Sequence, residues 1–313
     1  MSTGQPAARL ACWLVQRARV VAVVGPTAAG KSDLGVALAQ ALGGEVVNAD
    51  SMQLYRGMDV GTAKLRPEER GGVPHHLLDV WPVTRTATAA DYQALCRPVL
   101  DDLLARGVVP VLVGGSGLYL RAALDELEFP GTDPALRASL EEELARDGAP
   151  ALHARLRALD PQAAARMDPA NGRRVVRALE VVALTGAMPG RMTSYDARYP
   201  TAWVGLDRPD LAERTDRRVH RMFDDGLVDE VRRLEAEGLR EGATASQALG
   251  YRQVLALLDG ELDEPGARAA TAAATRRFVR RQRSWFRRDP RITWLDPAGD
   301  LLAQALEAAA RAG

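Results

Sequence analysis

The sequence predicts an α/β fold with a parallel sheet, a helical insertion and a helical C-terminal part. Short apolar runs rich in β-branched residues alternate with helical segments, which is the pattern of buried parallel strands joined by helices. Strand signals then stop between residues 121 and 199, where the chain is rich in Ala, Leu, Arg and Glu. We therefore expect a core formed by residues 1–120 and 200–313, with an insertion domain over 121–199.

The expected elements follow in order along the chain. The first strand, RVVAVV, ends at a Gly-Pro pair, and a helix starts at Lys31. A further helix is expected from Ala89 to Arg106, ahead of the third strand. Helical patterns cover residues 134–183 and 209–288, interrupted by turn signals such as Gly-Ala-Pro. The predicted strands are residues 19–24, 45–50, 108–115, 203–206 and 292–295.

Composition excludes several classes of protein. The chain has 313 residues, of which 47% are apolar, so a disordered protein is excluded. The 41 basic residues balance 41 acidic ones, which excludes a uniformly basic nucleic-acid coat protein but not a local basic patch. Cys12 and Cys96 cannot form a disulfide framework, so we expect a cytoplasmic protein. No apolar run approaches the roughly 18 residues that a membrane span needs.

A glycine-rich loop follows the first predicted strand. Residues 25–32 have the sequence GPTAAGKS and fit the pattern G-x-x-x-x-G-K-[ST], between an apolar strand and a helix. In such a loop, backbone N–H groups and the helix N-terminus surround phosphate oxygens, Lys31 contacts a terminal phosphate, and the Ser32 hydroxyl can ligate Mg²⁺. The motif predicts a bound di- or triphosphate without saying which. The expected phosphate-binding residues are Gly25, Pro26, Thr27, Ala28, Ala29, Gly30, Lys31 and Ser32.

Polar side chains follow the second and third predicted strands. Asp50 closes the second strand, and Ser116 follows glycines at the end of the third. The carboxyl ends of parallel strands face the ligand crevice, so Asp50 is expected near the phosphate loop. There Asp50 could accept a proton from a nucleophile, hold Mg²⁺ or cap a helix. The glycines would permit close approach of a ligand, and the lack of an acid at this strand end argues against an ordinary ATPase.

Two adjacent histidines, His75 and His76, raise the question of a metal site. No third ligand with zinc spacing accompanies them. We therefore expect a structural or substrate-lining role.

Arginine supplies 39 of the 41 basic side chains and gathers in three places. Such clusters can follow a phosphate backbone, and interleaved aromatic rings can stack on bases, whereas the alternative is a solvated helix face. Together with the phosphate loop they favour RNA or a polyphosphate. The clusters are Arg173, Arg174 and Arg177; then Arg214, Arg217, Arg218 and Arg221; and eight arginines between residues 276 and 291.

Only two lysines, Lys31 and Lys64, remain in this arginine-biased chain. We expect both sites to require a compact ammonium group where a planar guanidinium would not fit. Lys31 lies in the loop, and we expect Lys64 at the rim of the same crevice.

Seven motifs make the chain resemble the bacterial tRNA dimethylallyltransferases over about residues 20–290. The resemblance implies a P-loop NTPase-like core, with an insertion that grips the tRNA anticodon stem-loop. It implies transfer of a dimethylallyl group from dimethylallyl diphosphate to N6 of the adenosine 3′ of the anticodon, in tRNAs reading codons that begin with U. Diphosphate would be released, with Mg²⁺ as cofactor, and we expect a monomer. The motifs are GPTAAGKS, NADSMQLY, GTAK, PHHLLD, VGGSGLYL, RRVVRALEV and ALGYRQ.

The resemblance also assigns roles to residues. Asp50 would be the base or hydrogen-bond acceptor for the N6 amino group, and Lys31 and Arg218 would stabilise the leaving diphosphate together with Arg214. Ser116, a further candidate catalytic residue, stands where the family usually has Thr, and Gln253 stands where it often has Glu. The implied tRNA contacts are Asp50, Ser51, Met52, Gln53, Ser116, Arg137, Arg173, Arg174, Val175, Val176 and Arg177, to which the C-terminal cluster adds Arg280, Arg281 and Arg287.

Two other functions compete with this one. In a small-molecule kinase the loop would hold ATP and Asp50 would activate an alcohol. The arginine clusters, the helical insertion and the missing acid at the third strand argue against it. A non-catalytic, GTPase-like RNA-binding module is disfavoured because the chain has no guanine-recognising N/T-K-x-D motif.

Overall fold

The computed structural model describes residues 19–189 and 194–311, so Cys12 and the segment before the first strand lie outside it. The chain divides into two compact units. One runs up to Asp125 and resumes at Ala197, and the other is Glu126–Asp196. The insertion begins later than the expected residue 121, because helix α4 (Gly117–Leu124) continues to Leu124 and buries its last turn in the core of the first unit.

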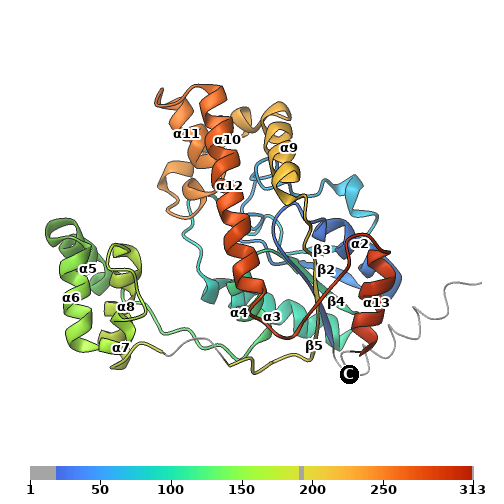
Figure 1. The fold of residues 1–313 in the computed structure, drawn as a ribbon, viewed down its shortest axis with the longest axis horizontal. Helices are drawn as coiled ribbons and strands as arrows, with labels where there is room; N and C mark the ends of the chain where they lie inside the picture. The colour runs from blue at the N-terminus through green and yellow to red at the C-terminus, as the bar shows by residue number, and fades with distance from the viewer. Residues whose placement is uncertain (1–18, 190–193, 312–313) are drawn as a thin grey trace, which may run out of the picture. The chain divides into compact units, whose positions relative to one another are not determined.

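The first unit is built on a six-stranded sheet with the order β3-β2-β4-β1-β5-β6 (Figure 1). Every strand pair is parallel, which confirms the predicted α/β class. Each predicted strand is present, and the short β3, which holds the two histidines, was missed. Two residues are too few to show a strand pattern. The strands are β1 (Val20–Val24), β2 (Glu45–Asn48), β3 (His75–His76), β4 (Pro110–Gly114), β5 (Thr201–Gly205) and β6 (Ile292–Trp294).

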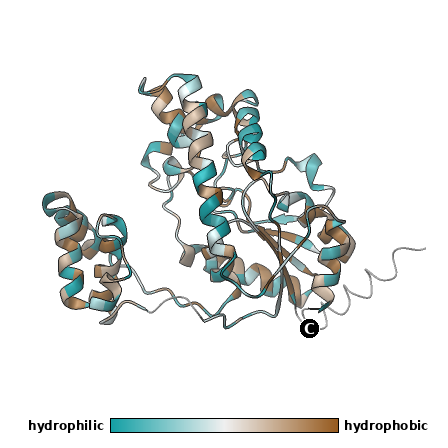
Figure 2. Cartoon of the chain, viewed as in Figure 1, coloured by the Kyte–Doolittle hydropathy of each residue, from teal (hydrophilic) through white to brown (hydrophobic). Residues whose placement is uncertain are grey.

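Helices cover both faces of this sheet, which explains why its strands are apolar throughout. Val21 and Val23 of β1 face the helices α2 and α13, while Val20 and Val24 face α3 and α4. Figure 2 shows the hydrophobic colour concentrated on the strands between these layers. The further helices of this unit are α2 (Lys31–Leu42), α3 (Ala89–Ala105), α9 (Leu211–Asp224), α10 (Leu227–Ala236), α11 (Tyr251–Leu258), α12 (Glu264–Phe286) and α13 (Leu301–Arg311).

All regular secondary structure among the described residues of the second unit is helical, as the sequence predicts. Its core is formed by Leu140, Leu152, Leu156 and Leu179, which come from three of its helices. The side chains of Asp133, Asp160 and Asn171 cap helix N-termini and so set the turns between them. The helices are α5 (Pro134–Asp147), α6 (Ala149–Leu159), α7 (Pro161–Ala164) and α8 (Gly172–Thr185).

A buried carboxylate ties the C-terminal helices to the loop that follows β2. Glu230 of α10 accepts hydrogen bonds from the backbone N–H groups of Asp59, Val60 and Gly61, at 3.0, 2.7 and 3.1 Å. The Tyr251 hydroxyl of α11 donates a fourth, at 2.5 Å. The segment 59–61 is therefore held against α10 and α11.

Gln253 has a local role at the start of α11. Its Oε1 accepts the N–H of Gly250 at 2.9 Å, which caps the helix N-terminus. A Gln side chain provides this cap as well as a Glu does.

No helix in residues 19–189 or 194–311 is long and apolar enough to cross a membrane.

Candidate active site

The phosphate loop joins β1 to α2 in a conformation that depends on its glycines. Gly25 has φ 141°, and a Cβ there would lie 2.2 Å from the carbonyl oxygen of Leu206. Gly30, at the N-terminus of α2, and Ala28 also have positive φ, at 97° and 65°. The loop therefore turns tightly and presents the N-terminus of α2, where backbone N–H groups favour an anion.

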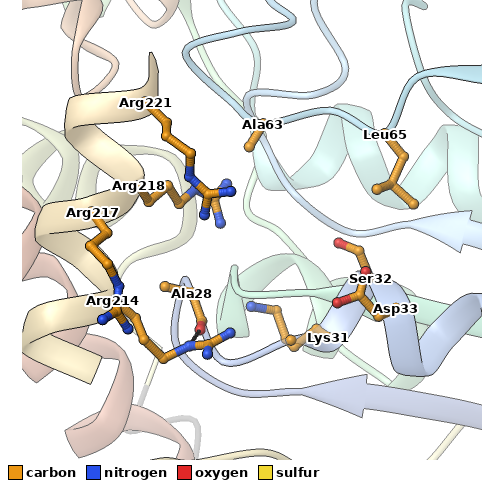
Figure 3. Close-up of a pocket in the computed structure, with 11 residues that line it drawn as sticks. Ala28, Lys31, Ser32, Asp33, Ala63, Leu65, Arg214, Arg217, Arg218 and Arg221 are labelled. Carbon is orange, nitrogen blue, oxygen red and sulfur yellow. Dashed lines mark hydrogen bonds between the residues drawn. The ribbon is translucent and has the colours of Figure 1, made fainter. Parts of the chain in front are cut away.

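A cavity of about 230 Å³ lies between this loop and helix α9. Figure 3 shows arginines of α9 directed towards the loop residues. One acid, Asp33, stands against five basic side chains in the lining. The cavity therefore suits a strongly charged anion such as a diphosphate. It is lined by Ala28, Gly30, Lys31, Ser32, Asp33, Ala63, Leu65, Arg214, Arg217, Arg218 and Arg221.

Protein carbonyls already hold several of these cations in place. Arg214 Nε donates to Ala28 O at 2.8 Å, and Arg218 Nη2 donates to Thr62 O at 3.0 Å. Arg218 Nε is buried and has no hydrogen-bond partner within the part of the chain that the structure describes. Buried donors are normally satisfied, so this unpaired N–H fits a site that receives an anionic oxygen.

The Lys31 ammonium group is short of compensating charge. Its Nζ donates to Pro26 O at 2.8 Å. Burial lowers its pKa to about 8, while Asp50 acts in the opposite direction and Arg218 lowers it further. Burial likewise lowers the pKa of Arg218. A bound anion would stabilise both cations.

A second cavity, of about 60 Å³, adjoins the first and shares Lys31, Ser32, Leu65 and Arg218 with it. Asp50 lies in its lining, so the structure brings Asp50 beside the phosphate loop as the strand order predicts. The rest of its lining combines apolar and polar side chains. Its other residues are Thr27, Val46, Asn48, Gln53, His75, Leu78, Val113 and Gly114.

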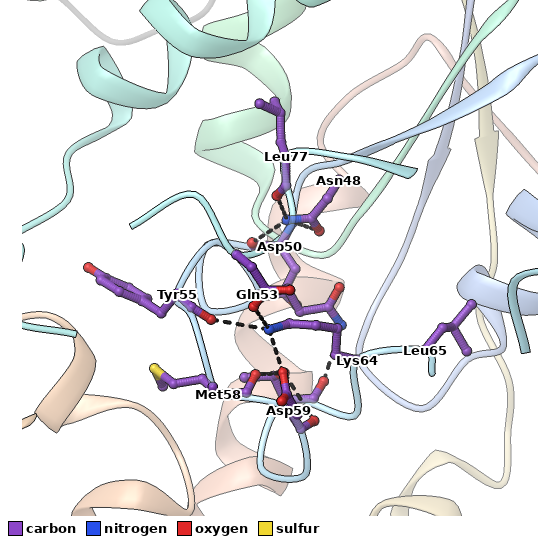
Figure 4. Close-up of polar contacts among 12 residues, drawn as sticks. Asn48, Asp50, Gln53, Tyr55, Met58, Asp59, Lys64, Leu65 and Leu77 are labelled. Carbon is purple, nitrogen blue, oxygen red and sulfur yellow. Dashed lines mark hydrogen bonds and ion pairs between the residues drawn. The ribbon is translucent and has the colours of Figure 1, made fainter. Parts of the chain in front are cut away.

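Asp50 is fixed by its own turn (Figure 4). Asn48 Oδ1 accepts the Asp50 N–H at 2.9 Å, and Asn48 Nδ2 donates to Asp50 O and Leu77 O at 3.1 and 3.0 Å. Asp50 Oδ1 accepts the Met52 N–H at 2.9 Å. No helix begins here in the described chain, so Asp50 closes a turn and does not cap a helix. This turn uses one carboxylate oxygen, and Oδ2 has no partner among the described residues, which leaves it for a ligand.

Ser116 reaches the neighbour of Asp50. Its hydroxyl donates to Ser51 Oγ at 3.3 Å and accepts the Ser51 N–H at 3.4 Å. It lines neither of the two cavities.

The glycines around Ser116 are needed for packing. A Cβ on Gly115 would lie 2.5 Å from Gln282 Nε2, and one on Gly117 would lie 2.0 Å from Trp285 Nε1. We expected a ligand to approach the backbone at these glycines. At Gly115 and Gly117 this expectation is wrong, because side chains of helix α12 fill the space.

Not every loop residue faces the cavities. Gly25, Pro26 and Ala29 are buried and line neither one. Thr27 lines the smaller cavity, but its N–H donates to Gln282 Oε1 at 2.9 Å and is not available to a phosphate. Of the predicted set, Ala28, Gly30, Lys31 and Ser32 line the larger cavity.

Sequence reasoning left several residues without a role in the site. Arg217 and Arg221 line the larger cavity, although the sequence placed them only in an arginine cluster and gave them no part in the site. Asn48, which holds Asp50, and Arg208, whose Nε donates to Ala29 O at 3.1 Å, gave no local signal because both act through contacts made by folding.

The C-terminal arginines lie outside both cavities. Arg280, Arg281 and Arg287 are exposed on or just after α12. Arg287 pairs with Asp207 at 3.2 Å, and the Arg281 guanidinium lies 5.7 Å from the ring centroid of Phe278. Their contact with tRNA stays a prediction.

In the second unit the predicted tRNA-binding residues divide into two kinds. Arg173 and Arg174 are exposed, whereas the side chains of Val175 and Val176 are buried in the core. The prediction that the side chains of these two valines contact tRNA is therefore wrong, because neither side chain is accessible. Their packing supports the helix that exposes the arginines.

Arg137 and Arg177 share an internal partner. Both donate to the fully buried carboxylate of Glu180, Arg177 at 2.6 Å. Burial alone would raise the pKa of Glu180, but the hydrogen bonds from the arginines outweigh it and lower that pKa. Arg137 therefore joins α5 to α8, whereas Arg177 lies on α8 itself and joins it to the carbonyls of Pro130 and Gly131, ahead of α5.

Lys64 is not at the rim of the crevice. It is buried, and its Nζ donates to Asp59 Oδ1 at 2.6 Å, Asp79 Oδ1 at 2.5 Å and Tyr55 O at 3.1 Å (Figure 4). The expected location is wrong. Three acceptors around one nitrogen nevertheless match an ammonium group, which has three donors, better than a planar guanidinium.

Lys64→Arg is therefore expected to lower stability and not activity. The larger group must displace its neighbours, at a cost of about 1–3 kcal/mol in the free energy of unfolding. Urea denaturation of the variant and the wild type measures this. If the variant keeps the stability of the wild type but has a raised KM for either substrate, Lys64 acts in substrate binding and this account of it is wrong.

The histidines have separate surroundings. His76 Nε2 lies 2.6 Å from Glu45 Oε2, away from the cavities. His75 lines the smaller cavity, with Nδ1 at 2.9 Å from Val73 O. Across the described segments, no group of three or more His, Cys, Asp and Glu side chains could hold a metal ion.

Comparison with known proteins identifies the family. Residues 53–289 match the model of the family described as IPP transferase. The chain is 66% identical over 280 residues to a tRNA dimethylallyltransferase of Streptomyces coelicolor, covering 88% of this chain and 90% of the relative. It is also 66% identical over 291 residues to one of Salinispora tropica, covering 92% and 91%.

Solved structures agree with this assignment. A full-length tRNA isopentenylpyrophosphate transferase of Bacillus halodurans is 40% identical, with a TM-score of 0.69, and the match covers 93% of this chain and 94% of that one. A eukaryotic dimethylallyltransferase acting on tRNA is 26% identical, with a TM-score of 0.75 over 89% and 74% of the two chains. The chain therefore belongs to the tRNA dimethylallyltransferase family.

Proposed function

We propose that the chain transfers a dimethylallyl group from dimethylallyl diphosphate to N6 of the adenosine 3′ of the anticodon, in tRNAs that read codons beginning with U. Dimethylallyl transfer to tRNA adenosine is the activity of the family. The proposed donor and acceptor rest on one observation, which is the pair of adjoining cavities. One is lined by cations and suits a diphosphate, and the other is partly apolar and contains Asp50.

The reaction is a substitution at the allylic C1. The N6 nitrogen forms a bond to C1, the C1–O bond breaks, and diphosphate leaves with the bonding electrons. The N6 proton passes to Asp50, whose Oδ2 has no protein partner in the described chain. Lys31, Arg214 and Arg218 stand beside the larger cavity and stabilise the charge that develops on the departing oxygens.

We also propose Mg²⁺ as the cofactor, held at Ser32. Ser32 lines both cavities, with Asp33 in the larger and Asp50 in the smaller. Mg²⁺ is commonly bound by few protein oxygens together with waters and substrate phosphates, so this donor set fits it. The ion would neutralise charge on the diphosphate.

The acceptor base must leave its stack to reach Asp50. Unstacking costs a few kcal/mol, and least in single-stranded loops such as the anticodon loop. The exposed Arg173 and Arg174 of the second unit, and the arginines of α12, are the groups proposed to bind the tRNA phosphates. We propose that the enzyme acts as a cytoplasmic monomer.

The position and identity of the modified base can be tested with tRNA transcripts. We expect N6-(dimethylallyl)adenosine after digestion of a transcript that reads a UNN codon and has adenosine 3′ of the anticodon. Replacing that adenosine by guanosine should abolish the product, and the same transcript with another first codon letter should react more slowly. Product at any other adenosine would contradict the proposed site of transfer.

The exposed arginines of α12 are expected to act on tRNA alone. Arg280→Gln combined with Arg281→Gln should raise the KM for tRNA and reduce the slope of log affinity against log salt by about two, one for each lost phosphate contact. The KM for dimethylallyl diphosphate should hardly change, since neither residue lines a cavity.

A matched control is Arg106→Gln with Arg311→Gln. Both arginines are exposed, and Arg106 precedes β4, at the edge of the sheet opposite the phosphate loop. If the α12 variant and this control show the same salt slope as the wild type, the α12 arginines form only a solvated face.

A further inference from the structure

Gln282 of α12 makes two contacts that connect parts of the candidate site. It is 6% exposed. Its Oε1 accepts the Thr27 N–H at 2.9 Å, and its Nε2 donates to Gly115 O at 2.9 Å. Because one contact needs an acceptor and the other a donor, only an amide in this orientation satisfies both.

The two contacts join segments that carry different parts of the chemistry. Thr27 lies in the phosphate loop, four residues before Lys31, whereas Gly115 directly precedes Ser116. Ser116 in turn contacts Ser51, the neighbour of Asp50. One side chain therefore fixes the loop that faces the diphosphate relative to the turn that contains Asp50.

The surroundings of Gln282 are built for this contact. Gly115 has no space for a side chain, since a Cβ would lie 2.5 Å from Gln282 Nε2. The next residue, Arg283, bonds Asp207 Oδ1 through Nε at 2.8 Å and also donates to Arg208 O. Arg208 donates to Ala29 O at 3.1 Å, so the same stretch of α12 supports the loop at a second point.

We propose that Gln282 is a positioning residue that sets the separation between the leaving-group site and the N6-accepting site. This inference rests on the proposed function. Small errors in the alignment of two reactants cost large factors in rate, and a misplacement near 1 Å can cost about 10²-fold. Gln282 touches neither cavity, so its loss should slow the chemical step more than it weakens substrate binding.

The test measures single-turnover transfer at saturating tRNA and dimethylallyl diphosphate, together with tRNA affinity and Tm. Gln282→Met keeps the size of the side chain and removes both hydrogen bonds, and it should lower the transfer rate by about 10–100-fold. tRNA affinity should change less than about threefold. Gln282→Glu keeps an acceptor for Thr27 but sets a carboxylate against Gly115 O, and it should be slowed by at least tenfold.

Thr271→Val is the matched control for general destabilisation. Thr271 is buried on the same helix, and its hydroxyl donates to Ala267 O at 2.8 Å, away from the loop. This variant should lose stability while keeping the wild-type transfer rate. If Thr271→Val is slowed as much as Gln282→Met, the effect is one of stability and the proposal fails.

Gly115→Ala tests the same contact by changing the residue that Gln282 touches. Its Cβ would displace the Gln282 amide, so it should slow transfer by a similar factor, and the double variant should be no slower than the slower single variant. Additive losses would overturn the proposal, as would transfer within about threefold of wild type in either folded Gln282 variant. Failure of the wild-type protein to modify tRNA would instead overturn the proposed function.

Discussion

Asp50→Ala is expected to lower the single-turnover transfer rate by about 10²–10⁴-fold, the usual effect of removing a general base. The carboxylate lies in the cavity that adjoins the phosphate loop, and its Oδ2 has no partner among the residues described. Affinity for tRNA should stay nearly unchanged, because the Asn48 contacts with the Asp50 backbone remain. Rapid-quench measurements at saturating substrates check this.

Asp50→Asn separates the two roles of this side chain. The amide oxygen can still accept the Met52 N–H, so the turn is kept, but the amide cannot take up a proton. We expect Asn to be as slow as Ala at this position. If Asn restores the rate, or if tRNA affinity collapses while chemistry survives, Asp50 is a turn-capping residue and not the base.

Lys31→Met is expected to lower the transfer rate by about 10²–10³-fold, as for the loss of one donor to a developing anion. Lys31 lines both cavities, and its Nζ is held by Pro26 O inside the loop. Lys31→Arg keeps the charge and changes the shape, and it should still cost at least about tenfold, or roughly 1.4 kcal/mol of transition-state stabilisation.

The affinity of both Lys31 variants for tRNA serves as the control. It should equal that of the wild type, because Lys31 is expected to act on the diphosphate and not on the tRNA. A Lys31→Arg variant that transfers at the wild-type rate would show that charge alone matters there. The expectation that this site needs a compact ammonium group, which rests on the scarcity of lysine in this chain, would then be wrong.

The sequence predicted what is encoded locally. The phosphate loop, the fully apolar β1 and the position of Asp50 after β2 follow from residues that are close together in the chain. The strand order then brings Asp50 beside Lys31, because the carboxyl ends of parallel strands share one edge of the sheet.

Contacts between distant residues could not be predicted in this way. Gln282 meets the phosphate loop across 255 residues, and nothing in its neighbourhood in the sequence marks it among the arginines. Lys64 was expected at the rim of the crevice because lysine is rare in this chain. Its side chain is instead buried and forms ion pairs with Asp59 and Asp79. Val175 and Val176 belong to a tRNA-binding motif by resemblance, but their apolar side chains pack in the core.

The assay that tests the central claim most directly uses purified protein, labelled dimethylallyl diphosphate and unmodified tRNA, with and without ATP. The two adjoining cavities predict that label enters tRNA at the same rate in both conditions, with diphosphate released in equal amount. A requirement for ATP, with tRNA left unlabelled, would contradict this account and favour the small-molecule kinase.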